Sequence, residues 1–76
     1  MNKSYYLIVR EPGRKLVPLE GPGSDRGIIW DIAVAERVAA ALSAEDTQYE
    51  FHICRVESSN DAIKGVVARY KNGTRR

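Results

Sequence analysis

The chain is poor in the residues that carry most catalytic and metal-binding chemistry. Its 76 residues include one cysteine and one histidine. A single cysteine cannot form a disulfide within the chain, which excludes the small secreted frameworks that depend on several such bonds. Long apolar runs are also missing, since Tyr5–Val9 near the start is too short for a signal-peptide core or a membrane span. We therefore expect a cytoplasmic protein that does not enter a membrane.

Acidic residues are missing from the C-terminal end. The chain carries a net charge of +2, but its first 63 residues hold seven basic and ten acidic residues. Every charged residue after position 63 is basic: Lys64, Arg69, Lys71, Arg75 and Arg76. This asymmetry predicts a mildly acidic body with a basic C-terminal end.

The clearest element is an amphipathic helix over residues 31–44. Apolar residues recur there at i, i+3, i+4 and i+7, the spacing that lines up one side of a helix. These residues are Ala35, Val38, Ala39 and Leu42. Asp31 precedes the first turn and is a good N-cap, because its side chain can accept from an unpaired backbone N–H. Such a helix needs an apolar sheet to cover its stripe.

The residues before the helix predict a hairpin and a loop. Residues 4–10 are β-branched and aromatic, residues 11–14 contain the Pro-Gly pair of a turn, and residues 15–20 are typical of a return strand. Pro18 cannot donate to a ladder, which either places this return strand at an edge or shortens it. Residues 21–27 form a glycine-rich loop that lacks the spacing and the Lys-Ser/Thr pair of a phosphate-binding loop.

The residues after the helix predict one strand and leave the next element open. Residues 48–56 alternate between Tyr, Phe and Ile on one face and polar side chains on the other. Residues 60–71 favour a second helix, because apolar residues again recur at i, i+3, i+4 and i+7 and Asn72-Gly73 is typical of a helix stop. The alternative is a strand with Val66, Ala68 and Tyr70 pointing inward.

Together these elements predict a single α+β domain over residues 1–73 and a basic tail over residues 74–76. We expect a three- to four-stranded, mostly antiparallel sheet with one amphipathic helix packed on a face. The expected order is strand, strand, helix, strand, followed by the C-terminal helix or its strand alternative.

One constellation could carry chemistry. Glu50, His52 and Cys54 share a face of the predicted strand, where they could hold a metal or pair as nucleophile and base. Side chains at i and i+2 run parallel and do not converge, and a fourth metal ligand is lacking. We therefore predict no catalytic residue, no cofactor and no metal, and classify the protein as a non-enzyme.

Two kinds of partner remain. Cations around an aromatic residue at the C-terminal end can bind phosphates and stack on a base, which predicts nucleic-acid binding as the alternative function. Aromatic residues and arginine most often carry the energy of protein interfaces, and an exposed edge strand can pair with a second copy or a partner. The interaction candidates are Trp30, Tyr70, Arg69, Lys71, Arg75 and Arg76.

The order of the elements resembles that of small proteins of bacteriophages and other mobile elements, among them anti-CRISPR proteins. The residues that carry this resemblance are Tyr5–Val9, Leu16–Pro22, Ala35–Asp46 and Tyr49–Val56. The resemblance implies a cytoplasmic, non-enzymatic inhibitor that binds and occludes a host protein complex. A protein-interaction module is accordingly the leading functional hypothesis.

Overall fold

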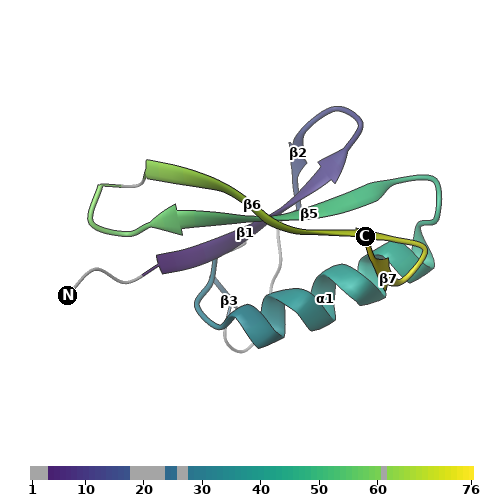
Figure 1. The fold of residues 1–76 in the computed structure, drawn as a ribbon, viewed down its shortest axis with the longest axis horizontal. Coiled ribbons are helices and arrows are strands. Elements are labelled where there is room, and N and C mark those ends of the chain that lie inside the picture. The colour runs from purple at the N-terminus through teal and green to yellow at the C-terminus, as the bar shows by residue number, and fades with distance from the viewer. Residues whose placement is uncertain (1–3, 18–23, 26–27, 61) are drawn as a thin grey trace.

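The computed structural model describes residues 4–17, 24–25, 28–60 and 62–76, in which one helix packs on one antiparallel sheet (Figure 1). The helix is α1 (Ile32–Glu45). The strands are β1 (Ser4–Glu11), β2 (Lys15–Leu16), β3 (Ser24–Asp25), β4 (Ile28–Ile29), β5 (Glu50–Glu57), β6 (Ala62–Lys71) and β7 (Thr74–Arg75). The α+β class and the helix on one face are confirmed. The predicted count of three to four strands and the predicted order are wrong, because seven strands are present in the described ranges, four before α1 and three after it.

Three long strands, β1, β5 and β6, form the body of the sheet. The strand order is β3-β4-β1-β5-β6-β7. β2 also pairs with β1, at the same edge as β4 and opposite the edge that pairs with β5. β1 and β5 stay in register from Ser4↔Glu57 to Glu11↔Glu50. β1 and β2 form the predicted hairpin, with a turn in which Gly13 has a φ of 107°.

Short strands replace part of the predicted glycine-rich loop. Ser24 and Asp25 form β3, which pairs with β4, and Ile29 of β4 pairs with Tyr6 of β1. The loop assignment is therefore wrong at these two residues, where backbone pairing overrides a turn-like composition. The rest of that loop and Pro18 lie outside the described residues.

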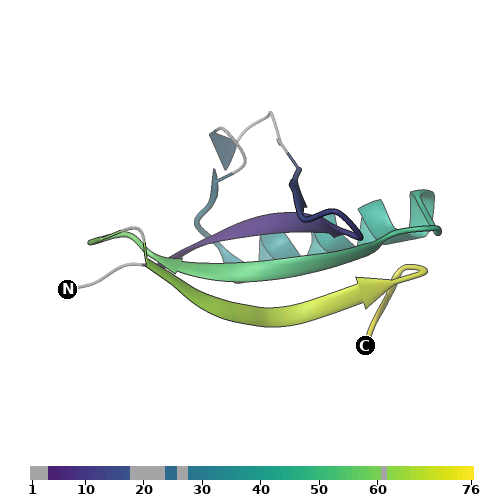
Figure 2. The same cartoon turned by 90° about the horizontal axis from the view of Figure 1, so that it is seen from above.

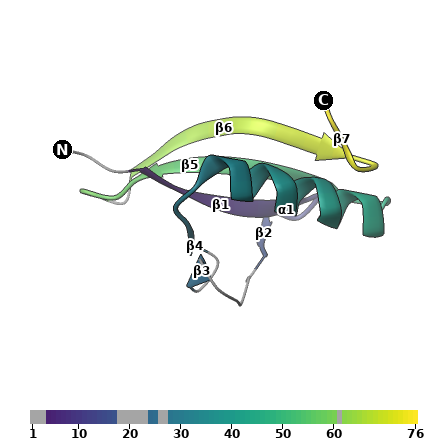
Figure 3. The ribbon, with the colours of Figure 1, turned by 90° about the horizontal axis from the view of Figure 1, so that it is seen from below.

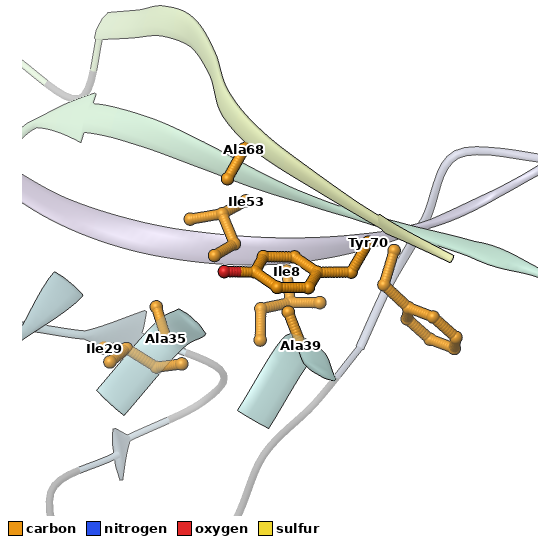
Figure 4. Packing of buried hydrophobic residues seen from close by; sticks show 8 residues of the cluster. Ile8, Ile29, Ala35, Ala39, Ile53, Ala68 and Tyr70 are labelled. Carbon is orange, nitrogen blue, oxygen red and sulfur yellow. The ribbon is translucent and has the colours of Figure 1, made fainter. Parts of the chain in front are cut away.

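The helix follows the sequence prediction closely. Asp31 is the N-cap, and its Oδ1 accepts from the backbone N–H of Ala33 at 2.9 Å. Figure 3 shows α1 lying across β1 and β5, and Figure 4 shows its buried alanines beneath Ile8 and Ile53. Ala35 and Ala39 are fully buried. Their methyl groups let the helix backbone approach the sheet closely, so larger apolar side chains from the strands fill the core.

The favoured helix over residues 60–71 is wrong, and the strand alternative is observed. Ala68 and Tyr70 are buried on the side of the sheet that faces α1, as that alternative predicts. Val66 instead pairs with Cys54 on the opposite face. The reason is a pair of bulges. The register passes from Ile53↔Ala68 to Cys54↔Val66, so that one residue of β6 is extra.

A second bulge lies a few residues closer to the N-terminal end of β6. The register passes from Arg55↔Gly65 to Val56↔Ile63, which leaves Lys64 extra. Each extra residue stretches the two-residue period of a strand to three, so a bulged strand imitates the apolar spacing of a helix. Gly65 has a φ of 129°, a conformation that favours glycine over other residues.

The C-terminal residues form a hairpin where a helix stop and a basic tail were expected. Asn72 and Gly73 both have positive φ, at 54° and 79°, which matches the tight two-residue turn that twists with a hairpin. Thr74 and Arg75 therefore return as β7 and pair with Lys71 and Tyr70.

A buried serine ties this last turn to the helix. The Oγ of Ser43 accepts from the backbone N–H of Gly73 at 2.9 Å and donates to the carbonyl of Ala40 at 3.0 Å. Ser43 has no exposed surface. A Cβ added to Gly73 would lie 3.0 Å from the Cβ of Ala44, so helix and turn are in close contact.

We predict that Ser43→Ala destabilises the fold. The substitution leaves the Gly73 N–H without its acceptor, which costs about 1–3 kcal/mol for a buried donor. The free energy of unfolding in urea measures this loss, with Ser59→Ala at an exposed serine as the control. Equal stability of the two variants would contradict the role of Ser43.

Candidate interaction surface

The sheet has a second face, which points away from α1. Figure 2 views the molecule from this side, and α1 lies behind β1 and β5. We call it the outer face. Its apolar half is formed by two rows of paired residues across β1, β5 and β6. The rows are Tyr5, Val56 and Ile63, and Leu7, Cys54 and Val66.

The other half of the outer face is charged. His52 of β5 pairs with Val9 of β1 on one side and with Arg69 of β6 on the other. The next row holds Glu11 opposite Glu50, followed by Lys71 on β6. We call Glu11, Glu50, His52, Arg69 and Lys71 the charged half. The outer face is therefore graded from apolar to charged along the strands.

The apolar half is open to solvent at its two edges. Ile63 is 69% exposed and Val66 is 40% exposed on β6. On the other side, the ring of Trp30 lies edge-on against Tyr5 at 5.5 Å between centroids, and 53% of Trp30 is exposed. Val56 between them is buried. Apolar side chains are therefore exposed on either side of a buried residue.

The two bulges of β6 together bring Val66 to this face and leave Ile63 on it. Without the extra residues, strict alternation from the buried Ala68 would send Ile63 to the outer face and Val66 to the helix side. With them, Val66 and Ile63 both lie beside outer-face residues of β5. Sequence reasoning missed both residues as candidates. Gly65 inside the predicted helix was the available signal, because an isolated glycine in an apolar strand often marks a bulge.

Glu50 is the centre of the charged half. Its Oε1 accepts from Nε2 of His52 at 2.6 Å, and Arg76 forms an ion pair with its other oxygen. The hydrogen bond from His52, followed by the contacts of Arg76, lowers the pKa of Glu50, whereas desolvation acts in the opposite direction. This carboxylate is therefore held in its charged form by cationic and hydrogen-bonding neighbours.

The other charged side chains of this half differ in the partners that they contact. Arg14 lies 3.7 Å from Glu11, and Nζ of Lys71 donates to the carbonyl of Thr47 at 2.9 Å. Arg69 is exposed and makes no side-chain hydrogen bond or ion pair with any described residue. Among the described residues, no carboxylate therefore forms an ion pair with Lys71 or Arg69.

The residues predicted from the sequence as interaction candidates lie in different parts of the structure. Trp30, Arg69 and Lys71 lie on or beside the outer face, whereas Tyr70 is only 6% exposed and belongs to the core. Arg75 turns toward the helix, where it lies 3.5 Å from Glu36. The basic end therefore does not form one continuous patch.

The Glu50, His52 and Cys54 constellation is brought together only in part. Glu50 and His52 are hydrogen-bonded, and Cys54 lies in the adjacent apolar row. Within the described ranges, no three His, Cys, Asp or Glu side chains are grouped to hold a metal ion. Burial raises the pKa of the Cys54 thiol, which disfavours the nucleophilic thiolate.

The chain matches no protein-family model, and comparison with curated proteins and with solved structures finds no similar protein. The resemblance to mobile-element proteins therefore stays a prediction. In the part of the chain that the structure describes, no helix has the length and apolarity to cross a membrane.

We predict that Glu50 makes the stability of the fold depend on pH. A carboxylate whose folded pKa is below its ordinary 4.5 stabilises the fold above that value, and this contribution is lost as the pH falls through the lowered pKa. The free energy of unfolding should consequently drop less between neutral pH and about pH 3 in Glu50→Gln than in the parent protein. Glu45→Gln, at an exposed helix position, is the control. A pH dependence unchanged by Glu50→Gln would contradict the assignment.

We also predict that Cys54 reacts slowly in the folded protein. A raised pKa reduces the thiolate fraction near neutral pH, and partial burial limits access. The rate of alkylation by iodoacetamide should be lower in buffer than in urea, and its rise with pH should be displaced to higher values. Identical rates for the folded and the unfolded chain would argue against this environment.

Proposed function

We propose that the protein is a non-enzymatic interaction module that binds a protein partner through its outer face. The observation that carries the proposal is the apolar half, which exposes Trp30 at one edge and Ile63 and Val66 at the other, with buried Val56 between them. Exposed apolar side chains gathered on one face with a polar border are typical of protein–protein interaction sites.

The exposure of the apolar side chains fits this role. Complete burial of an exposed isoleucine or valine side chain stabilises a complex by about 1.5–3 kcal/mol. Trp30, which packs against Tyr5, and Ile63 lie at opposite ends of the row of Tyr5, Val56 and Ile63, and both are more than half exposed. Burial of both ends by one partner adds several kcal/mol, part of which offsets the entropy lost on association.

Nucleic-acid binding through the basic end has less support. Arg75 and Arg76 already form ion pairs with Glu36 and Glu50, so these cations must exchange a carboxylate for a phosphate. Each such exchange reduces the net gain that phosphate contacts give. The acidic side chains beside them also repel a polyanion.

An interaction module of this kind acts by occupying a surface. The outer face is made from three hydrogen-bonded strands, which hold their side chains at fixed spacing. A partner that binds such a preorganised face loses access to that part of its own surface. Inhibition of a host complex by occlusion, as the resemblance to phage proteins implies, is the form of activity that we propose.

We predict that the partner contacts position 63 and not the far side of the helix. A photo-crosslinking residue at position 63 should form one discrete protein adduct in the cells that encode the chain, whereas the same residue at exposed Ala41 should not. Val66→Asp in the crosslinking chain should reduce the adduct by about tenfold, because an unpaired charge opposes burial.

The unfolding midpoint of each crosslinking variant must match that of the parent. An equal adduct from position 41, or an adduct that survives Val66→Asp, would reject the outer face as the binding surface. Crosslinking to nucleic acid in place of protein would favour the alternative function.

A further inference from the structure

We infer that the outer face takes an extended segment of the partner in which two apolar side chains are followed by a carboxylate side chain, each two residues apart. This inference rests on the proposed function and names the chemistry of the partner. It is carried by the shape, the charge and the spacing of the outer face.

The outer face holds two adjoining depressions. One, of about 340 Å³, is lined by Val9, Cys54, Ile63 and Val66, and also by the polar side chains of Glu11, Arg14 and His52. The other, of about 530 Å³, lies over the charged half and is lined by Arg69 and Lys71 among others. Glu11, Arg14, His52 and Val66 line both depressions, so the ion-paired side chains lie where the two meet. The two depressions therefore form one shallow trough that is apolar at one end and charged at the other.

The charged end of the trough favours an anion. Glu50 is already engaged by a hydrogen bond with His52 and an ion pair with Arg76, and Glu11 lies within ion-pair distance of Arg14. Arg69, by contrast, has no side-chain partner among the described residues. An exposed guanidinium can bind a carboxylate through two parallel hydrogen bonds, so an acidic side chain is the group that complements this end.

The spacing of the rows favours an extended chain. Ile63 pairs with Val56, Val66 with Cys54, and Arg69 with His52, and these residues of β5 are two apart in sequence. Rows two residues apart along a strand are separated by roughly 6.5–7 Å, which is also the separation of side chains i and i+2 in an extended peptide. An apolar residue, a second at i+2 and an acid at i+4 thus match three successive rows.

Strand addition at the edge of β6 is a weaker mode. The C-terminal residues already use this edge, since the N–H of Arg76 donates to the carbonyl of Arg69 and the guanidinium of Arg75 donates to that of Val67. The two bulges also disrupt the ladder there. A second copy of the chain is likewise disfavoured on the face, because its own Arg69 and Lys71 would add charge of the same sign.

The test uses fluorescently labelled, acetylated peptides with the sequence Ser-Leu-Thr-Leu-Thr-Glu-Ser, the reverse order, and versions with Gln or Lys in place of Glu. Binding to the intact chain is measured by fluorescence anisotropy. We expect the Glu peptide, in at least one of the two orders, to bind about tenfold more tightly than the Lys peptide, with the Gln peptide between them.

Matched variants assign this preference to the trough. Arg69→Glu should reverse the preference between the Glu and the Lys peptides, whereas Arg37→Glu, at an exposed cation of α1, should leave it unchanged. Ile63→Ser should weaken the binding of all peptides at least fivefold. These positions are exposed, so the unfolding midpoints of the variants should stay close to that of the parent.

The outcomes distinguish this inference from the proposed function. Equal binding of the Glu and Lys peptides, with loss in Ile63→Ser, would overturn the acidic partner and keep the outer face as the binding surface. Binding that is unaffected by Ile63→Ser, or no binding at all, would overturn the inference, and crosslinking at position 63 would then decide the proposed function separately. A dimer in solution that Ile63→Ser dissociates would identify a second copy as the occupant and overturn the inference.

Discussion

The structure depends on one contact, in which the alanine side of α1 packs against the isoleucines of β1 and β5. Ala35 and Ala39 meet Ile8 and Ile53 there, and all four are fully buried. One helix can cover only one face of a sheet, and α1 is the one helix in the described part of the chain. The other face must therefore be composed for contact with water or with a partner. The residues on this other face are therefore the feature most closely tied to function.

Elements built on a regular period could be predicted from the sequence. The helix from Ile32 to Glu45 with its Asp31 cap, and the alternation of β5, have the expected periods and needed no tertiary information. β6 could not be assigned in this way, because its bulges at Lys64 and Val67 convert a two-residue period into a three-residue one. Asn72-Gly73 was read as a helix stop, although the same pair is a strong hairpin signal. Both errors arise where local pairing geometry overrides periodicity.

The candidate surface could be predicted only in part, and for a different reason. Exposure of Trp30 and burial of Tyr70 depend on which strands neighbour them, which composition does not reveal. Ion pairs distant in sequence, such as Arg76 with Glu50, decide which cations of the basic end stay available. The sequence therefore identified the basic residues, but the separation of Arg69 from its paired neighbours required the fold. The grading of the outer face emerges only when the register of three strands is known.

The exposed apolar residues of β6 contribute little to the stability of the fold, and this makes them informative. Ile63 remains 69% exposed, so most of its transfer free energy is not used in folding. A threonine or a lysine there would suit a solvated strand and would reduce the risk of association between chains. Lys64, the extra residue of a bulge, lies beside Ile63 and is held by Glu57 at 3.0 Å, which keeps a charge next to the apolar row. The free energy that folding leaves unused at Ile63 and Val66 is available to a partner, and the neighbouring charges restrict which partner can gain it.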